Sequence, residues 1–141
     1  MVLKSAKAII IVNDKYLLQL RDNNKKNYFP NYWGLFGGQL NKNETYSNAA
    51  KREIKEEKNL NIKIFKKIFS VNFNIIGLKK RRSIIYYECK IKKQANIILA
   101  EGQKYKFFSF NKIKKLKIVP IDFVAINAHY YKNKNYPYSY K

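Results

Sequence analysis

Short apolar blocks alternate with polar segments along most of the chain, and each block has the length of a strand or a helix. β-Branched runs at 6–12 and 16–20, separated by the polar residues 13–15, predict a hairpin. The lysine-rich stretch 22–31 is typical of a loop. Further strands are predicted at 32–36, 62–75, 83–91 and 105–110, with a turn at 77–80 between the two longest.

Two segments have the features of helices. In 45–58, Thr45 suits the N-cap and Ile54 supplies an apolar contact. Pro120 suits the first turn of a second helix at 120–131. Strands on both sides of one helix, with another helix near the end, indicate an α/β sandwich with a mixed central sheet.

The length of the chain and its cysteine content suggest a simple organisation. A chain of 141 residues fits one domain, 1–141, with a flexible polar tail expected at 132–141. Its single cysteine, Cys89, cannot form an internal disulfide, which is consistent with a cytoplasmic protein. No apolar run approaches transmembrane length, so no membrane partner is expected. The oligomeric state stays open between a monomer and a homodimer.

The charge of the chain is strongly positive, with a formal net charge of +21. One interpretation is that the protein binds nucleic acid or another polyanion. The other is a compositional bias, because lysine far outnumbers arginine and the lysines are scattered along the whole chain. Arginine is the better reader of phosphates and base edges. We therefore favour a diffuse charge that attracts small anionic substrates over a dedicated nucleic-acid surface.

The few acidic residues are unevenly distributed, because four of nine are Glu44, Glu53, Glu56 and Glu57. In a helix, positions i, i+3 and i+4 share a face, so the last three of these point together while the neighbouring lysines lie opposite. Like charges at this spacing cost about 0.2–0.5 kcal/mol per pair. A bound Mg²⁺ or Mn²⁺ would reverse that repulsion, because both ions prefer carboxylate oxygens. The alternative is a solvated acidic face.

The sequence around these glutamates has a longer pattern. Gly38 is followed by five residues and Glu44, and then by seven residues and the run Arg52-Glu53-Ile54-Lys55-Glu56-Glu57-Lys58-Asn59-Leu60. The pattern resembles the Nudix box, G-x5-E-x7-R-E-U-x-E-E-x-G-U, at eight of its nine specified positions. Asn59 stands where the family has glycine, and asparagine tolerates the left-handed conformation that ends many helices.

The resemblance implies a role for each box residue. Glu56 and Glu57 would be the principal metal ligands, Glu53 would complete or support the site, and a backbone carbonyl at Gly37 or Gly38 would add a ligand. Arg52 would pair with Glu44 or another box glutamate and hold the loop against the helix. Two residues compete for the role of general base, Glu53 and Glu101. Glu101 is a candidate for a further metal ligand as well, and an ordinary loop glutamate is the alternative.

The implied activity is that of a pyrophosphohydrolase requiring Mg²⁺ or Mn²⁺, within a Nudix-type α/β/α sandwich. Its substrate would be a nucleoside diphosphate linked to a group X, such as a modified nucleoside triphosphate or a nucleotide sugar. Arg21 and Trp33 are candidates for binding it, with solvated surface and apolar core as the alternatives. A second hypothesis is an RNA 5′-end pyrophosphohydrolase or an RNA-binding member of the family. His129 is assigned no catalytic role, and Asp122 is expected to stabilise a helix N-terminus.

Overall fold

The computed structural model describes residues 2–23, 29–58, 62–75, 77, 79–91 and 105–133. Along these segments the chain forms the following strands and helices: β1 (Val2–Val12), β2 (Lys15–Leu20), β3 (Trp33–Gly34), β4 (Phe36–Gln39), α1 (Tyr46–Lys58), β5 (Ile62–Ile75), β6 (Lys80–Ile91), β7 (Tyr105–Phe108), α2 (Phe110–Ile113) and α3 (Pro120–Asn133).

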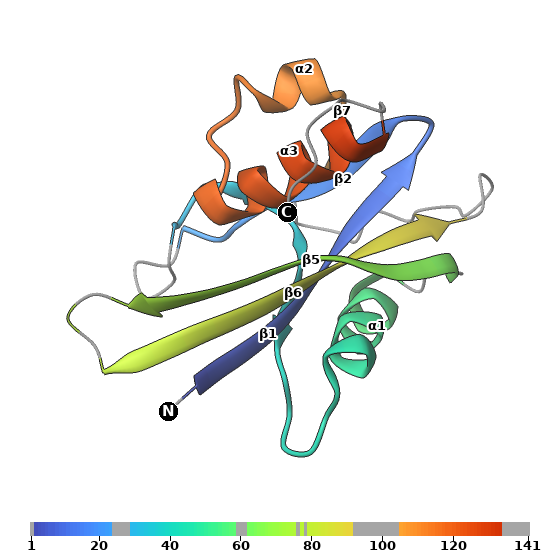
Figure 1. Cartoon of the computed structure of the whole chain (residues 1–141). Helices are drawn as coiled ribbons and strands as arrows, with labels where there is room; N and C mark the ends of the chain where they lie inside the picture. The colour runs from blue at the N-terminus through green and yellow to red at the C-terminus, as the bar shows by residue number, and fades with distance from the viewer. Residues whose placement is uncertain are drawn as a thin grey trace.

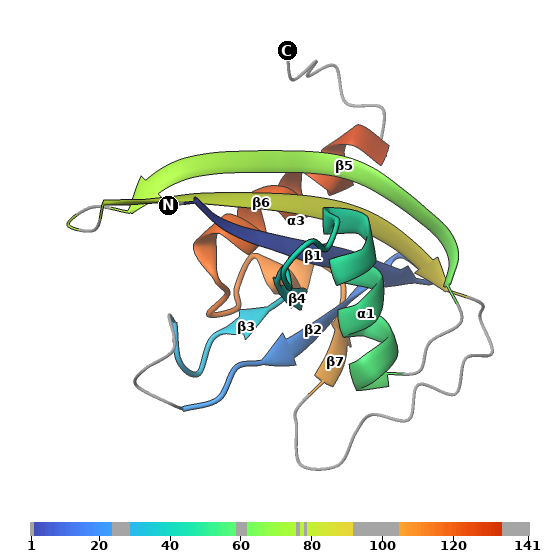
Figure 2. The same cartoon turned by 90° about the horizontal axis from the view of Figure 1, so that it is seen from below.

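The strands form one mixed sheet, as the sequence predicts. Its main order is β3-β2-β1-β6-β5, while β4 pairs with β1 and β7 pairs with β2. β1 and β6 run parallel, and the other pairs are antiparallel. Helix α1 covers one face of the sheet and α3 covers the other (Figures 1 and 2). The α/β sandwich is therefore confirmed.

The alternation of side chains along β1 divides the core between the two faces. Ala8 and Ile10 pack with Ile54 of α1 and with Cys89. Ile9 points the other way and packs with residues of α3. Because alternate residues of a strand face opposite sides, Ser5 and Lys7 share the α3 face with Ile9. Both are buried, so β1 places two polar side chains among apolar neighbours.

Several predicted boundaries were wrong. Two strands start earlier than expected, because β1 begins at Val2 rather than at position 6 and β6 begins at Lys80 rather than at position 83, within the predicted turn. Segment 32–36 is not one strand, because it divides into β3, which pairs with β2, and β4, which pairs with β1. The strand predicted at 105–110 stops at Phe108, since Ser109 caps α2 and its side chain accepts a hydrogen bond from the amide of Lys112. Helix α3 continues to Asn133, so positions 132 and 133 are helical rather than part of a loose tail. The rest of that tail lies outside the described residues.

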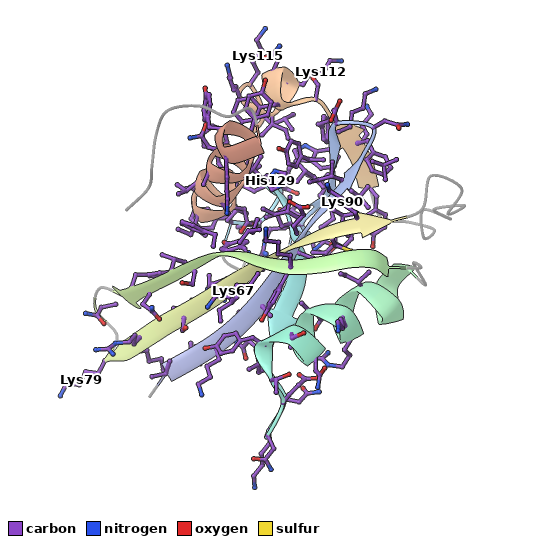
Figure 3. All side chains as sticks on the ribbon, turned by 45° about the vertical axis from the view of Figure 1, so that its right-hand side comes forward. Lys67, Lys79, Lys90, Lys112, Lys115 and His129 are labelled. Carbon is purple, nitrogen blue, oxygen red and sulfur yellow. The ribbon has the colours of Figure 1, made fainter. Side chains whose placement is uncertain are left out.

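Exposed lysines occur at widely separated places on the molecule. Figure 3 shows Lys79 at the tip of the β5–β6 hairpin, whereas Lys112 and Lys115 surround α2 on the other side of the sheet. Lys67 and Lys90 lie along β5 and β6 between these ends. No helix in the described part of the chain is long and apolar enough to cross a membrane.

Candidate functional site

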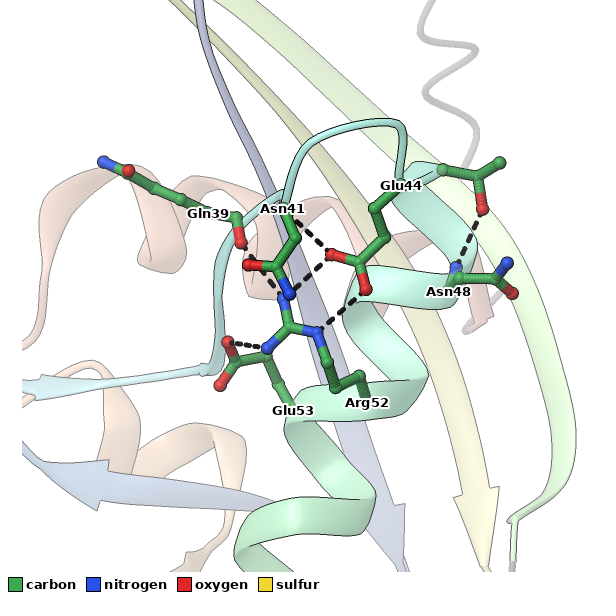
Figure 4. A network of polar contacts seen from close by, with 7 residues as sticks. Gln39, Asn41, Glu44, Asn48, Arg52 and Glu53 are labelled. Atoms are coloured by element: carbon green, nitrogen blue, oxygen red, sulfur yellow. Dashed lines mark hydrogen bonds and ion pairs between the residues drawn. The ribbon is translucent and has the colours of Figure 1, made fainter.

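An arginine at the centre of α1 holds the preceding loop in place (Figure 4). Arg52 donates from Nε to Glu44 Oε2 at 2.8 Å and from Nη2 to Glu44 Oε1 at 2.9 Å. The backbone amide of Asn41 donates to the same Oε1 at 2.9 Å. The hydrogen bond from Arg52 is the main reason why the pKa of Glu44 falls to about 2. The predicted pairing of Arg52 with Glu44 is confirmed, and its two parallel hydrogen bonds fix the loop geometry.

The same guanidinium connects the loop to Glu53, which the family pattern implies as a metal ligand. Arg52 Nη1 donates to Glu53 Oε1 at 3.0 Å, and Nη2 donates to the carbonyl of Gln39 at 3.2 Å. Glu53 in turn lies against the backbone of β4, where a Cβ added at Gly38 would stand 2.5 Å from Glu53 Oε1. A side chain at position 38 would therefore displace the carboxylate. Arg52, Glu53 and Gly38 form one connected group between the centre of α1 and β4.

Helix α1 begins directly after the predicted N-cap. It is continuous through all three of its glutamate positions. Thr45 Oγ1 accepts a hydrogen bond from the amide of Asn48 at 3.1 Å, which confirms the N-cap. Buried Ala49, Ala50 and Ile54 orient the helix on the sheet. The helix continues to Lys58, so positions 56 and 57 follow Glu53 by three and four residues without a break.

For four residues with expected roles, the structure describes the helical backbone of two and nothing of the other two. The side chains of Glu56 and Glu57 lie outside the described part, and so do Asn59 and Glu101. Among the side chains that the structure does describe, no group of three histidine, cysteine, aspartate or glutamate residues could hold a metal ion. The roles expected for these four residues therefore stay predictions.

A cavity of about 510 Å³ adjoins Gly37 and Gly38 on the α3 side of the sheet. Arg21, one of the two expected substrate-binding residues, lines it. Trp33, the other, is not among the described lining residues, and its ring packs edge-on against Phe108 at a centroid distance of 4.9 Å. The remaining lining includes two cations and five apolar side chains: Lys7, Arg82, Phe29, Phe73, Ile84, Val119 and Ile121.

A buried ion pair, not predicted from the sequence, lies beside the cavity. Lys7 Nζ donates to Asp122 Oδ1 at 2.8 Å and to Oδ2 at 3.0 Å. The Tyr86 hydroxyl donates to Oδ1 at 2.8 Å, and the Leu35 amide donates to Oδ2 at 3.0 Å. Asp122 does lie in the first turn of α3, as expected, but it is wholly buried. A lysine inside the apolar run 6–12 was the available signal.

A second buried polar group connects α3 to the sheet. The Tyr16 hydroxyl lies 2.9 Å from His129 Nδ1, and His129 Nε2 lies 2.7 Å from Glu88 Oε2. Burial is the main cause that lowers the pKa of His129. Burial opposes ionisation of Glu88, but hydrogen bonds from His129 and Lys90 hold its pKa below the ordinary value. This group satisfies buried polar atoms between two elements, and none of its three members is among the described residues that line the cavity.

Comparison with known proteins assigns the chain to a family. The family model described as NUDIX domain matches residues 2–129, so the chain belongs to this family. The chain is therefore a hydrolase that acts on pyrophosphate bonds.

Solved structures share its fold. A MutT-type Nudix hydrolase from methicillin-resistant Staphylococcus aureus 252 matches with a TM-score of 0.71 and 28% identity over 90% of this chain and 94% of that one. The Escherichia coli dihydroneopterin triphosphate pyrophosphohydrolase matches with a TM-score of 0.69 and 21% identity, over 87% and 91% of the two chains. Shewanella oneidensis NrtR in complex with a 27mer DNA matches with a TM-score of 0.72 and 18% identity, over 88% of this chain and 58% of that one.

Proposed function

We propose that this protein is a Mg²⁺- or Mn²⁺-dependent pyrophosphohydrolase that cleaves the diphosphate linkage of a nucleoside diphosphate-X compound. The substrate is a nucleoside triphosphate or a nucleotide sugar. The base of the triphosphate is either canonical or modified. One observation carries the proposal. The Arg52, Glu44 and Glu53 group contacts β4 at Gly38, and the same glycine lines the cation-lined cavity. A group that handles the diphosphate therefore adjoins a space that can hold the rest of a nucleotide.

The donor set suits a hard divalent cation. Glu53, Glu56 and Glu57, with a backbone carbonyl at Gly37 or Gly38, offer only oxygen ligands. The absent side chain at Gly38 leaves room for the Glu53 carboxylate against β4. Arg52 contacts Oε1 of Glu53, so the carboxylate keeps a second oxygen for the ion. When bound, such an ion supplies charge neutralisation at the diphosphate and acidifies an attacking water.

The chain's own residues position the reactants. Arg52 contacts Glu44, Glu53 and the Gln39 carbonyl, so it acts as a positioning residue that keeps the β4–α1 loop in register with the helix. A carboxylate accepts the proton of the attacking water. Glu53 and Glu101 are the two candidates for that base, and Glu53 is held in place by Arg52. On the cavity side, Arg21 supplies a cation for phosphate or for the X group.

A substrate panel tests the proposal. Purified protein is incubated with nucleoside triphosphates, nucleotide sugars and dinucleotide polyphosphates, with Mg²⁺ or with excess EDTA, and the products are separated by chromatography. We expect a nucleoside monophosphate and the complementary phosphorylated product only when the metal is present. Release of inorganic phosphate alone, or no cleavage of any anhydride, would contradict the proposal.

The runner-up function is processing of an RNA 5′ end. The net charge of +21 and the basic segment Lys79–Arg82 in the β5–β6 hairpin favour it, and the NrtR relative was crystallised with DNA. The separation of the labelled lysines in Figure 3 favours small substrates instead. The two functions differ in preference: faster hydrolysis of triphosphorylated RNA than of free nucleotides at physiological salt would make the runner-up the better proposal.

A further inference from the structure

The charged side chains that line the cavity all have the same sign. Lys7, Arg21 and Arg82 contribute to its surface, whereas no acidic side chain is found among the described lining residues. Lysine and arginine side chains donate hydrogen bonds and accept none. The amides of Gln39 and Asn74, which also line the cavity, can present either a donor or an acceptor. Fixed charge in the cavity therefore favours a ligand that offers acceptors.

Two buried polar atoms of the lining have no hydrogen-bond partner in the described part of the chain. These atoms are Ser5 Oγ and Arg21 Nε. Ser5 is only 2% exposed, so its hydroxyl cannot be satisfied by bulk water in the way a surface serine is. Buried polar atoms are normally paired, and an unpaired one calls for a ligand or water. Both atoms belong to residues that line the cavity, so its wall contains polar groups that the described part of the chain leaves unpaired.

Apolar residues show what shape of ligand fits. Phe29 from the loop before β3 and Phe73 from β5 both line the cavity while 42% and 37% exposed. Ile84, Val119 and Ile121 line it as well. A phosphate group would gain nothing from these side chains and would lose hydration against them. A planar heterocycle gains from both the aromatic rings and the donors.

Asp122, which is hydrogen-bonded to the lining residue Lys7, is prevented from accepting a hydrogen bond from a ligand. A carboxylate has about four lone-pair positions, and Asp122 receives four contacts: two from Lys7 and one each from Tyr86 and the Leu35 amide. Gly37 allows this arrangement, because a Cβ there would stand 2.8 Å from the Lys7 Cγ. Lys7 thus covers Asp122 from the cavity side and leaves it no acceptor position for a ligand.

We propose that Lys7 is a specificity-determining residue. Its ammonium group occupies the acceptor positions of Asp122 that would face the cavity. The cavity therefore binds a heterocycle with a keto group more tightly than one with an amino group at the same position. Without Lys7, Asp122 would offer an acceptor to an amino group. The inference rests on the proposed function, since it assumes that the heterocycle of a nucleotide substrate occupies the cavity. Well-placed hydrogen bonds to a base edge discriminate by about fivefold to about 150-fold.

The test uses inosine monophosphate and adenosine monophosphate, which differ in a keto against an amino group at C6 and in protonation at N1. Neither contains an anhydride bond, so their binding is independent of hydrolysis. Dissociation constants are measured by calorimetry for the wild type, for Lys7→Met and for Lys4→Met. Lys4 is the matched control, because it lies on the same strand but is exposed and is not among the described lining residues of the cavity.

We expect the wild type to bind the inosine compound at least about fivefold more tightly. Lys7→Met should reduce or invert that ratio by at least about fivefold, and Lys4→Met should keep it. Equal binding by the wild type, no measurable binding of either compound, or an unchanged ratio in folded Lys7→Met would each overturn the proposal. Failure of the proposed function looks different, because the monophosphates would bind selectively while no anhydride is cleaved.

Removal of Lys7 leaves a buried carboxylate without its cation, so Lys7→Met could fail to fold. Lys7→Gln addresses this possibility, because its amide still donates one hydrogen bond to Asp122 while reopening an acceptor position. Circular dichroism and thermal unfolding establish that the variant is folded. We expect Lys7→Gln to lower the binding ratio in the same direction as Lys7→Met. A folded Lys7→Gln protein with the wild-type ratio would overturn the proposal.

Discussion

Two polar networks lie on opposite sides of the sheet, and they differ in how far apart their members are in the sequence. On the α1 side, Arg52 and Glu44 are 8 residues apart and partly exposed. On the α3 side, Lys7 and Asp122 are 115 residues apart and buried. A motif within one loop and one helix can be recognised from residue spacing. A pair that joins the first strand to the last helix exists only once the sheet has brought them together.

The two networks should also respond differently to perturbation. The α1 network adjoins the expected metal ligands and is open to solvent, so changes there should affect turnover more than stability. The α3 network is inside the core, where an uncompensated charge is costly, so changes there should affect stability as well as ligand preference. The following predictions test this contrast, beginning with the largest effect.

Removal of divalent metal should abolish activity while leaving the fold intact. The acidic positions of α1 require a cation to act on a diphosphate, whereas no described side chain of the α3 network is arranged around a metal. Turnover is measured in millimolar Mg²⁺ and in excess EDTA, with thermal unfolding as the control. Full turnover in EDTA would show that the glutamates of α1 have another purpose.

Asp122→Ala should destabilise the protein by about 3–5 kcal/mol, because it leaves Lys7 buried without its partner. It also leaves the Tyr86 hydroxyl and the Leu35 amide unpaired. The free energy of unfolding is measured by urea denaturation. Glu44→Ala is the matched variant in the α1 network, and it should cost much less stability. Equal losses for the two variants would remove the contrast between the networks.

Glu57→Gln keeps the shape of the side chain and removes the charge of an expected metal ligand. We expect turnover to fall at least about a hundredfold while the unfolding midpoint stays near that of the wild type. Steady-state kinetics on the best substrate of the panel gives the measurement. Lys51→Gln, at an exposed position of the same helix, is the control. Turnover close to the wild type would show that Glu57 is not a ligand.

The ion pair of the α1 network should persist into strong acid. The pKa of Glu44 is lowered to about 2, chiefly by the hydrogen bond from Arg52. A lowered folded-state pKa contributes stability that is complete above the ordinary glutamate pKa of about 4.3 and is lost as the pH falls from there through the folded value. Carbon-detected NMR should give a midpoint near the lowered value, and Arg52→Gln should return it toward the ordinary one. A normal midpoint in the wild type would contradict the pairing in solution.

Asn59→Gly should have the smallest effect. Position 59 follows α1, where the family pattern has glycine, and a left-handed conformation there costs glycine nothing. We expect the free energy of unfolding to stay the same or to rise slightly, and turnover to be unchanged. Urea denaturation and steady-state kinetics measure both quantities. A clear loss of stability would indicate that Asn59 makes a contact that glycine cannot replace.

Much of the fold followed from local patterns. The hairpin of β1 and β2, the N-cap at Thr45 and the helix after it were predicted, because each depends on residues within a few positions of one another. The break between β3 and β4 was missed, since the two strands are defined by different partners in the sheet. The short helix α2 was missed because Phe110 continues the apolar run of β7. Phe110 and Ile113 have a helical spacing, and both are buried in the α3-side core.

By itself, the sequence determined the family pattern and the cap of α1, because both depend on residues close together in the chain. The resemblance implied that Arg52 pairs with Glu44 or another box glutamate, and the structure shows hydrogen bonds to both Glu44 and Glu53. Only the tertiary structure decided that Lys7 lies against Asp122 beside a cavity that also contains Arg21 and Arg82. Lys7 comes from β1, Asp122 from α3 and Arg82 from β6, and Arg21 follows β2. No spacing rule connects them, because their proximity depends on the order of strands in the sheet and on how α3 packs across it.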